Sequence, residues 1–337
     1  MSKVSVEANE TEKINQDVRV SVICKTYNQE RYIRQCLESL VSQKTNFKYE
    51  IIVHDDASTD KTADIVREFA EKYSDLIVPI YQTENQYSKR VNTNLKFIHP
   101  ILRGEYVAIC EGDDFWTDEN KLQIQFDYMN SNPECTLCCH TAYYANEDSS
   151  IIEDRLFRSY EKSCEIPMEE LLVGWKMATN SIMYKFSARG NDVIPFQGDC
   201  RNGDLAQAVY LGLKGKIYYI DKPMSAYRVS SVGSLGWVWR SNFDLYRDSR
   251  TKYVEMLGRI DEYTNGKYHD VIKERQAAEL FNMYVYVGDL KSARKYKDRF
   301  KKLPISAKVK LTAKHLFPSL YMKSRARWHK KKEEDRK

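Results

Sequence analysis

The sequence predicts an α/β fold in which a Rossmann-like sheet is flanked by helices and followed by a helical C-terminal appendage. Short β-branched runs alternate with apolar residues at helical spacing over the first third of the 337-residue chain. Acidic loops follow two of these runs directly, and from Arg240 onward long helical patterns replace the strands. Strands that alternate with helices indicate parallel pairing through right-handed crossovers, with helices on both faces of the sheet.

The first predicted strand spans residues 19–24 and ends at a polar loop that contains Tyr27 and Asn28. Beyond the loop, apolar residues recur at helical spacing from Tyr32 to Val41. The segment is therefore expected to fold as a strand, a loop and a helix.

A second strand is predicted at residues 50–54, and it runs directly into Asp55 and Asp56. Ser58 or Thr59 is placed to cap the helix that follows, because small hydroxyl side chains favour that position.

The third strand is expected at residues 76–81, where Pro79 favours an edge position since proline cannot donate to a sheet ladder. Apolar residues at helical spacing then predict a helix between Val91 and Leu102. The apolar run 106–109 predicts a fourth, buried strand.

Three carboxylates, Glu111, Asp113 and Asp114, follow that fourth strand around Gly112. Like charges in contact raise one another's pKa, so such a cluster favours a divalent cation that neutralises it. The alternative is an Asp- and Gly-rich turn ahead of a helix N-terminus, which also favours acids.

In a doubly wound sheet, the carboxyl ends of the parallel strands lie on one edge, where ligands collect. We therefore expect Tyr27, Asn28, Asp55, Asp56 and the carboxylates of residues 111–114 to converge on one ligand.

In their order and spacing, the blocks 20–28, 51–60 and 111–114 resemble the family 2 glycosyltransferases. The resemblance is clear from about Val18 to Tyr143 and weaker to about Ser234. It implies the GT-A fold with a mixed sheet, a nucleotide-diphosphate-sugar donor that is more often a UDP-sugar, a divalent metal (Mn²⁺ or Mg²⁺), and inversion at the anomeric carbon.

The resemblance also implies roles for the site residues. Tyr27 and Asn28 would contact the nucleotide, with the Tyr27 ring on the base; Asp56 would bond the base edge and Asp55 would steady the loop. Asp113 would contact the ribose and, with Asp114 and Glu111, the metal. Glu111 stands where the family more often has Asp, which lengthens its reach by one methylene.

The middle of the chain is expected to form the acceptor side. A helix is predicted after Trp116, strands at residues 136–141 and 217–220, and a variable loop at 159–167. Residues 179–184 read as a strand and resemble the family's acceptor-pocket segment.

Asp204 precedes an apolar helix, and the resemblance implies that this acid is the general base, in preference to Asp199. The alternative is a helix cap, which Asp often forms. Ser230 stands where the family often has a histidine, so a further metal ligand from that segment is not implied. Residues 233–239 fit either a cover over the donor or a loop anchored by tryptophans.

The predicted organisation is a disordered segment 1–17, a GT-A domain 18–236, a helical region 237–320 and a basic tail 321–337. The first residues lack the apolar core of a signal peptide, and no run is long enough to span a bilayer, so a cytoplasmic protein is expected. The eight cysteines are expected to be buried, reduced thiols.

The implied reaction is transfer of a hexosyl or N-acetylhexosaminyl group to a hydroxyl of a saccharide or lipid-linked saccharide in surface polysaccharide biosynthesis. The basic tail around Trp328 fits either a solvated end or a patch that contacts the inner membrane face. The modest net charge of +5 does not favour nucleic acid as a partner, and the sequence is compatible with a homo-oligomer.

Two functions other than glycosyl transfer place different demands on the sequence. A nucleotidyltransferase would need a glycine-rich phosphate loop after the first strand, but residues 25–30 contain no glycine. A non-catalytic module could retain the nucleotide pocket and recruit partners through the helical appendage, although intact acids in all three blocks argue against it.

Overall fold

The computed structural model describes residues 18–174, 177–200, 203–229 and 242–317, which divide into two compact units. The first unit takes in residues 18–168, 177–193 and 207–229, and it contains the sheet. The second unit takes in residues 169–174, 194–200, 203–206 and 242–317, and it is helical. The N-terminal segment, Ser230, residues 233–239 and the basic tail lie outside the described residues.

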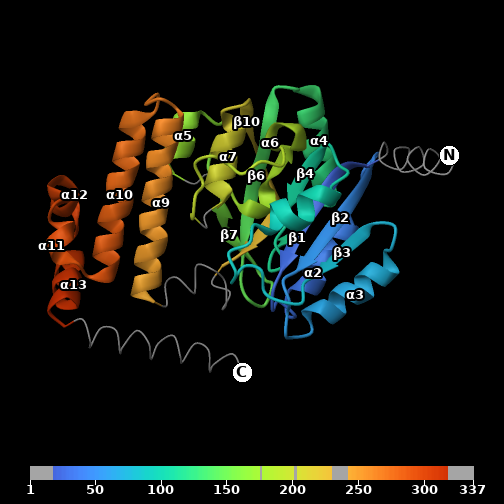
Figure 1. The fold of residues 1–337 in the computed structure, drawn as a ribbon, viewed down its shortest axis with the longest axis horizontal. Helices are drawn as coiled ribbons and strands as arrows, with labels where there is room; N and C mark the ends of the chain where they lie inside the picture. The colour runs from blue at the N-terminus through green and yellow to red at the C-terminus, as the bar shows by residue number, and fades with distance from the viewer. Residues whose placement is uncertain (1–17, 175–176, 201–202, 230–241, 318–337) are drawn as a thin grey trace, which may run out of the picture. The chain divides into compact units, whose positions relative to one another are not determined.

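The first unit is built on a ten-stranded sheet with the order β3-β2-β1-β4-β9-β6-β10-β5, to which β7 adds beside β6 and β8 beside β10 (Figure 1). The strands are β1 (Val18–Thr26), β2 (Lys48–Asp55), β3 (Ile77–Tyr81), β4 (Tyr106–Ile109), β5 (Phe115–Trp116), β6 (Cys135–Ala145), β7 (Ile151–Phe157), β8 (Cys164–Glu165), β9 (Met183–Lys185) and β10 (Lys216–Arg228).

The four strands β3, β2, β1 and β4 are parallel to one another, as the alternation of strands and helices predicts. Strand β3 lies at the end of the sheet order, so the expectation that Pro79 marks an edge strand is confirmed. The buried runs Val20–Cys24 and Ile51–Val53 of β1 and β2 supply the centre of the core.

The other half of the sheet is mixed. Strand β9 is antiparallel to both β4 and β6, whereas β6 and β10 are parallel to each other. The whole is the mixed sheet of the GT-A fold that the resemblance implies, and not the all-parallel sheet that alternation alone predicts.

Helices lie along this sheet and bury one apolar face each (Figure 1). Helix α2 (Ile33–Val41) contributes Cys36 and Leu40, helix α3 (Thr62–Lys72) contributes Phe69, and helix α4 (Lys121–Ser131) contributes Phe126. The short helix α6 (Phe186–Arg189) also belongs to the first unit. Helix α5 (Met168–Val173) falls almost wholly in the second unit, and α7 (Gly203–Gly212) has residues in both.

Two local predictions are wrong. The segment between Val91 and Leu102 is a π-helical turn (Asn94–Ile98) followed by a 3-10 turn (His99–Ile101), because Pro100 has no N–H to continue an α-helix. Ser58 and Thr59 do not cap α3; its N-terminal residue Thr62 instead donates its backbone N–H to Asp60 Oδ1 at 2.9 Å.

Two further segments differ from the sequence prediction. Thr179–Ser181 forms a 3-10 turn, and the strand begins only at Met183. Strand β7 was not predicted, because most of its residues are exposed and its sequence lacks an alternating apolar pattern.

The second unit is built on two long helices, α9 (Phe243–Tyr263) and α10 (His269–Val287), joined by a short turn (Figure 1). The side chain of Asn242 caps α9, and Gly288, with φ of 85°, ends α10. Helices α11 (Leu290–Ala293), α12 (Lys297–Lys302) and α13 (Ile305–Leu316) follow and share a small core with α10. None of the described helices combines the length and the apolar character needed to cross a membrane.

Candidate functional site

The two acidic loops attach to neighbouring residues at the carboxyl end of β1. Asp56 donates its backbone N–H to Thr26 O at 3.0 Å, and Gly112 donates its N–H to Lys25 O at 2.9 Å. The loops after β2 and β4 therefore flank the same strand end. This confirms that the acidic blocks meet at one edge of the sheet.

Gly112 is held in a space that only glycine fits. A Cβ at this position would lie 2.4 Å from Gln29 Oε1 and 2.8 Å from Thr26 Oγ1. The close approach brings the acidic loop against the end of β1, and it explains a glycine between the carboxylates.

Asn28 joins the loop after β1 to the loop after β2. Its side-chain oxygen accepts the backbone N–H of Thr59 at 2.8 Å, and its own N–H donates to Ser58 Oγ at 2.9 Å. Ser58 in turn donates its N–H to the Asp55 carboxylate at 3.1 Å. Tyr27, beside this junction, is 45% exposed, so its side chain is accessible to a ligand.

Asp56 is buried and ties the loop after β2 to the loop after β3. Its two carboxylate oxygens accept the backbone N–H groups of Gln86 and Tyr87 at 2.8 and 3.0 Å. The Asn85 side chain also donates to Asp56 O at 3.2 Å. Three strand-end loops are thereby linked at one edge.

The three carboxylates of the acidic loop differ in burial. Glu111 and Asp113 are partly exposed, whereas Asp114 is 2% exposed. Asn180 Nδ2 donates to one oxygen of Asp114 at 3.0 Å, and the backbone N–H of Arg228 donates to the other at 2.8 Å. Burial, reinforced by the neighbouring charge of Asp113, raises the pKa of Asp114 well above its usual value.

The Arg228 guanidinium is buried beside this loop and joins it to two other segments. Its nitrogens donate to Asp113 O at 2.7 Å, to Asn146 O at 2.7 Å and to Gln35 Oε1 at 3.1 Å. It also lies 4.3 Å from the centroid of the Tyr32 ring. Arg228 therefore fixes the main chain of the acidic loop at Asp113.

A fully buried lysine lies behind the loop. Lys121 Nζ sits 4.0 Å from the Trp116 ring centroid and donates to Gln125 Oε1 at 2.7 Å. Burial lowers the pKa of Lys121 to about 7. The Gln125 side-chain amide in turn donates hydrogen bonds to Cys138 O and Ser181 O.

In the part of the chain that the structure describes, no three His, Cys, Asp or Glu side chains are grouped where they could hold a metal ion. A protein-only cage is thus not present there. Mg²⁺-type sites that bind nucleotides commonly use one or two carboxylates and complete the shell with phosphate oxygens and water.

Asp204 and Asp199, the two candidate bases, belong to the second unit and are both exposed. Asp204 lies in the first turn of α7. Its assignment as the base stays a prediction.

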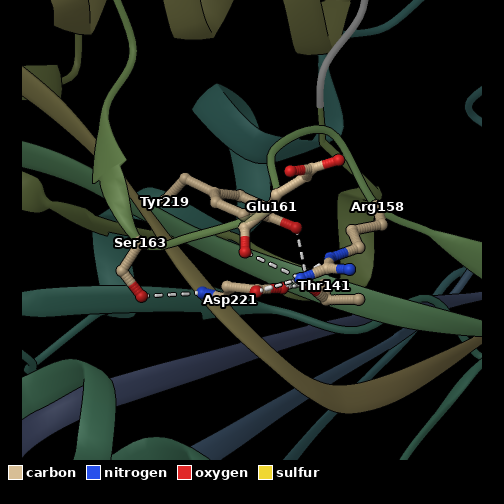
Figure 2. Close-up of polar contacts among 6 residues, drawn as sticks. All are labelled: Thr141, Arg158, Glu161, Ser163, Tyr219 and Asp221. Atoms are coloured by element: carbon tan, nitrogen blue, oxygen red, sulfur yellow. Dashed lines mark hydrogen bonds and ion pairs between the residues drawn. The ribbon is translucent and has the colours of Figure 1, made fainter.

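A separate polar cluster fixes the connection between β7 and β8 onto β6 and β10 (Figure 2). Its members are Thr141, Arg158, Glu161, Ser163, Tyr219 and Asp221. Arg158 pairs with both oxygens of Asp221, which lowers the pKa of that carboxyl, and Thr141 Oγ1 donates to the same group at 3.1 Å. The loop predicted as variable is therefore anchored at Arg158 and Ser163.

Sequence reasoning missed Asn180, Arg228 and Lys121 as parts of this neighbourhood. Asn180 and Arg228 fall in segments that resemble the family, but no local pattern singles out either side chain. Their role depends on Asp114, which is 66 and 114 residues away along the chain.

Comparison with known proteins agrees with this geometry. The model of the family described as "Glycosyl transferase family 2" matches residues 21–189. The uncharacterized protein Rv1520 of Mycobacterium tuberculosis is 34% identical over 239 residues, which are 71% of this chain. The aligned region covers 64% of that relative's length.

Two solved structures share the fold. The mannosyltransferase PcManGT of Pyrobaculum calidifontis, in complex with GDP-Man and Mn²⁺, has a TM-score of 0.51 and 19% identity, covering 94% of this chain and 85% of that one. S. aureus TarS 1–349 in complex with UDP-GlcNAc has a TM-score of 0.50 and 16% identity, covering 85% of this chain and 92% of that one. With half of its residues matched by the family model and its sheet arranged as in these proteins, the chain belongs to glycosyl transferase family 2.

Proposed function

We propose that this protein is an inverting glycosyltransferase that moves a sugar from a nucleotide-diphosphate sugar, a UDP-sugar in the first instance, to a hydroxyl of a saccharide or lipid-linked saccharide. The transferred group is a hexose or an N-acetylhexosamine, and the product is a surface polysaccharide. The observation that most directly supports this proposal is that the loops of Asp56 and Asp113 are hydrogen-bonded to adjacent residues at the end of β1.

The proposed donor site uses the geometry of these loops. Tyr27 offers an exposed ring to the base, while Asn28 and Asp55 hold the loops in place. Each Asp56 carboxylate oxygen accepts one backbone N–H and retains a second lone pair for the base edge. UDP-GlcNAc in TarS and GDP-Man in PcManGT support a nucleotide-sugar donor, and the family resemblance favours the uridine carrier.

Mn²⁺ or Mg²⁺ is the proposed cofactor, and Glu111, Asp113 and Asp114 are its predicted protein ligands. Because these side chains are not grouped as a three-ligand site, one or two of them would hold the ion together with diphosphate oxygens and water. The carboxylates of Glu111 and Asp113 are partly exposed, so a cation that shares phosphate and water ligands fits them. Asp114 already accepts two hydrogen bonds inside the protein, so its share in holding the ion is expected to be smaller than that of Asp113. When bound, the ion would stabilise charge on the departing diphosphate as a Lewis acid.

The proposed general base is Asp204, which would accept the proton of the acceptor hydroxyl as that oxygen attacks the anomeric carbon. The C–O bond to the diphosphate breaks as the new glycosidic bond forms on the opposite face. A positioned base typically contributes on the order of 100- to 10,000-fold to the rate. Asp199 is the alternative base.

The donor is tested by thermal unfolding with UDP-, TDP- and GDP-sugars, each with and without MnCl₂. A donor at a hundredfold its dissociation constant should stabilise the fold by about 2.7 kcal/mol. The expected result is a metal-dependent shift for one nucleotide class. The absence of any shift across the panel would contradict the donor proposal.

Catalysis is tested with matched Asp→Asn variants. Asp204→Asn should retain the donor-induced shift but lose transfer, Asp113→Asn should lose both, and Asp199→Asn should keep both. Equal transfer by Asp204→Asn and the parent protein would remove the base assignment. Donor binding without hydrolysis or transfer on any acceptor would favour a non-catalytic module.

A further inference from the structure

Helix α13 exposes an apolar stripe to solvent. Its members are Ile305, Val309 and Leu316, which are 80%, 62% and 63% exposed. Their spacing of four and seven residues places them on one face of the helix. Phe317, just beyond the helix, is also 57% exposed.

The opposite side of the same helix is already packed. Leu311 is 1% exposed and shares a core with Phe281 of α10 and with Leu290 and Ala293 of α11. The stripe is therefore not the face that holds α13 in its own unit. An exposed apolar face that is not needed for the unit's own core is typical of a surface that binds another apolar surface.

Positive charge surrounds this stripe. Residues 290–317 contain ten lysines and arginines against one acid, Asp298, although the whole chain carries only +5. By its position on the helix, Lys310 lies beside the stripe, and the exposed Lys301 and Lys302 precede it. Lys308 instead donates its Nζ to Lys301 O at 3.0 Å. The strongly positive segment thus coincides with the exposed apolar residues.

From this coincidence we propose that α13 docks the protein on an anionic phospholipid bilayer, with Ile305, Val309 and Leu316 entering the headgroup boundary and the exposed Lys302 and Lys310 facing the lipid phosphates. A helix with an apolar face and a lysine-rich polar face lies in the interface plane in this way. The surface is made of residues of the helical unit, and none of them belongs to the proposed donor site.

Other occupants fit the residues less well. A nucleic acid or another polyanion would use the lysines, but aliphatic side chains gain nothing from a phosphate backbone. A second copy of the chain would bring two strongly positive segments together, which is unfavourable. Of these three occupants, the bilayer with negative headgroups is the one that uses both the stripe and the charge.

The experiment is co-sedimentation of the full chain with vesicles of phosphatidylcholine alone or with added phosphatidylglycerol. Binding is expected only with the anionic lipid, and it should weaken as salt is raised. Failure of the full chain to bind anionic vesicles at low salt would overturn the proposal.

Variants separate the stripe from the charge. Ile305→Ser/Leu316→Ser should weaken vesicle binding by about tenfold or more, and Lys302→Gln/Lys310→Gln by about fivefold per lysine. The matched controls Val173→Ser/Val193→Ser and Lys162→Gln/Lys61→Gln, which alter exposed residues elsewhere, should bind as the parent does. Val309→Trp should strengthen binding, because tryptophan favours the interface.

The remaining outcomes count against the bilayer. If the lysine variant loses binding while the stripe variant does not, the surface binds polyanions in general. If the stripe variant changes only the oligomeric state, the stripe is a contact between copies. Circular dichroism of each variant checks folding, and hydrolysis of the donor in solution, which does not involve α13, should be unchanged.

Discussion

At the scale of single residues, Arg228 connects the acidic loop to distant parts of the first unit. Its guanidinium bonds the main-chain oxygens of Asp113 and Asn146, and its backbone N–H bonds Asp114. The planar fork of arginine makes these bonds in fixed directions, which a lysine ammonium does not reproduce. Arg228 is thus a positioning residue for Asp113.

We expect Arg228→Lys to lower the kcat for donor hydrolysis by about 10- to 100-fold, since a displacement of Asp113 by about 1 Å is enough for such a loss. Stability should fall by about 1–3 kcal/mol, because buried acceptors lose a donor. Steady-state kinetics and urea unfolding measure the two effects. Arg67→Gln, an exposed arginine on α3, serves as the control, and equal kcat values for both variants would contradict the role.

Lys121 gives a prediction about pH. Burial lowers its pKa to about 7 in the folded protein, whereas the unfolded value is about 10.4. Between these two pKa values the unfolded chain binds more protons at Lys121 than the folded protein does. The contribution of Lys121 to the free energy of unfolding therefore rises as pH rises through that window, and it is lost as pH falls toward about 7.

Lys121→Met should remove this dependence. The unfolding free energy of the parent relative to the variant should increase by up to about 1.4 kcal/mol per pH unit between about pH 7 and pH 9. Urea unfolding at several pH values measures it, and groups that titrate in both proteins cancel. For the exposed control Lys162→Met, the plot of unfolding free energy against pH should be parallel to that of the parent. A parallel plot for Lys121→Met as well would show that the buried ammonium does not titrate as expected.

At the scale of elements, the β4–β5 connection is shaped by what it packs against. Gly112 lies against the side chains of Thr26, the last residue of β1, and Gln29, from the loop that follows it. Thr26 also bonds Gln29 at 2.8 Å, so the two side chains form one wall. The position of the carboxylates therefore depends on the loop after a different strand.

Gly112→Ala should displace this connection, because the added Cβ overlaps that wall. We expect a loss of stability of about 1–3 kcal/mol, typical of overpacking, together with weaker binding of the donor. Thermal unfolding with and without nucleotide sugar measures both. Gly174→Ala, whose Cβ would meet nothing nearer than 3.6 Å, is the matched control, and an unchanged donor response in Gly112→Ala would contradict the packing argument.

At the scale of the whole molecule, the burial of the cysteines shows how well the core is shielded from solvent. All eight are thiols, as expected from the sequence, and seven of them are buried. Cys36 Sγ lies 3.8 Å from the sulfurs of Cys24 and Cys110, well beyond a disulfide bond length of about 2.05 Å. Burial raises the pKa of Cys110, Cys138 and Cys139, so their reactive thiolate forms are scarce.

We expect a thiol reagent to modify at most Cys164 quickly in the native protein and all eight cysteines after denaturation, because only Cys164 is partly exposed. Time-resolved titration with a chromogenic disulfide, followed by mass spectrometry, identifies the site. Fast reaction of several cysteines in the native state would show that the sheet core opens.

The sequence by itself determined the features that depend on neighbouring residues. The apolar runs of β1, β2 and β4 predict buried strands, and Pro79 predicts the edge of the sheet. Asp55, Asp56 and Asp113 lie at or just after strand ends, where a parallel sheet collects ligands. These residues, in this order, also carried the family resemblance.

Only the tertiary structure decided which polar groups are buried and what satisfies them. Asp114 is enclosed by Asn180 and Arg228, and Lys121 lies wholly inside the core, although charged residues are rarely buried. The physical reason is that a buried polar group is stable only with partners. For Asp114 those partners come from a turn and a strand far along the chain, whereas Lys121 has nearby partners but is enclosed only once its helix packs on the sheet. Periodicity reports the neighbours of a residue in sequence, whereas these contacts exist only once the sheet has formed.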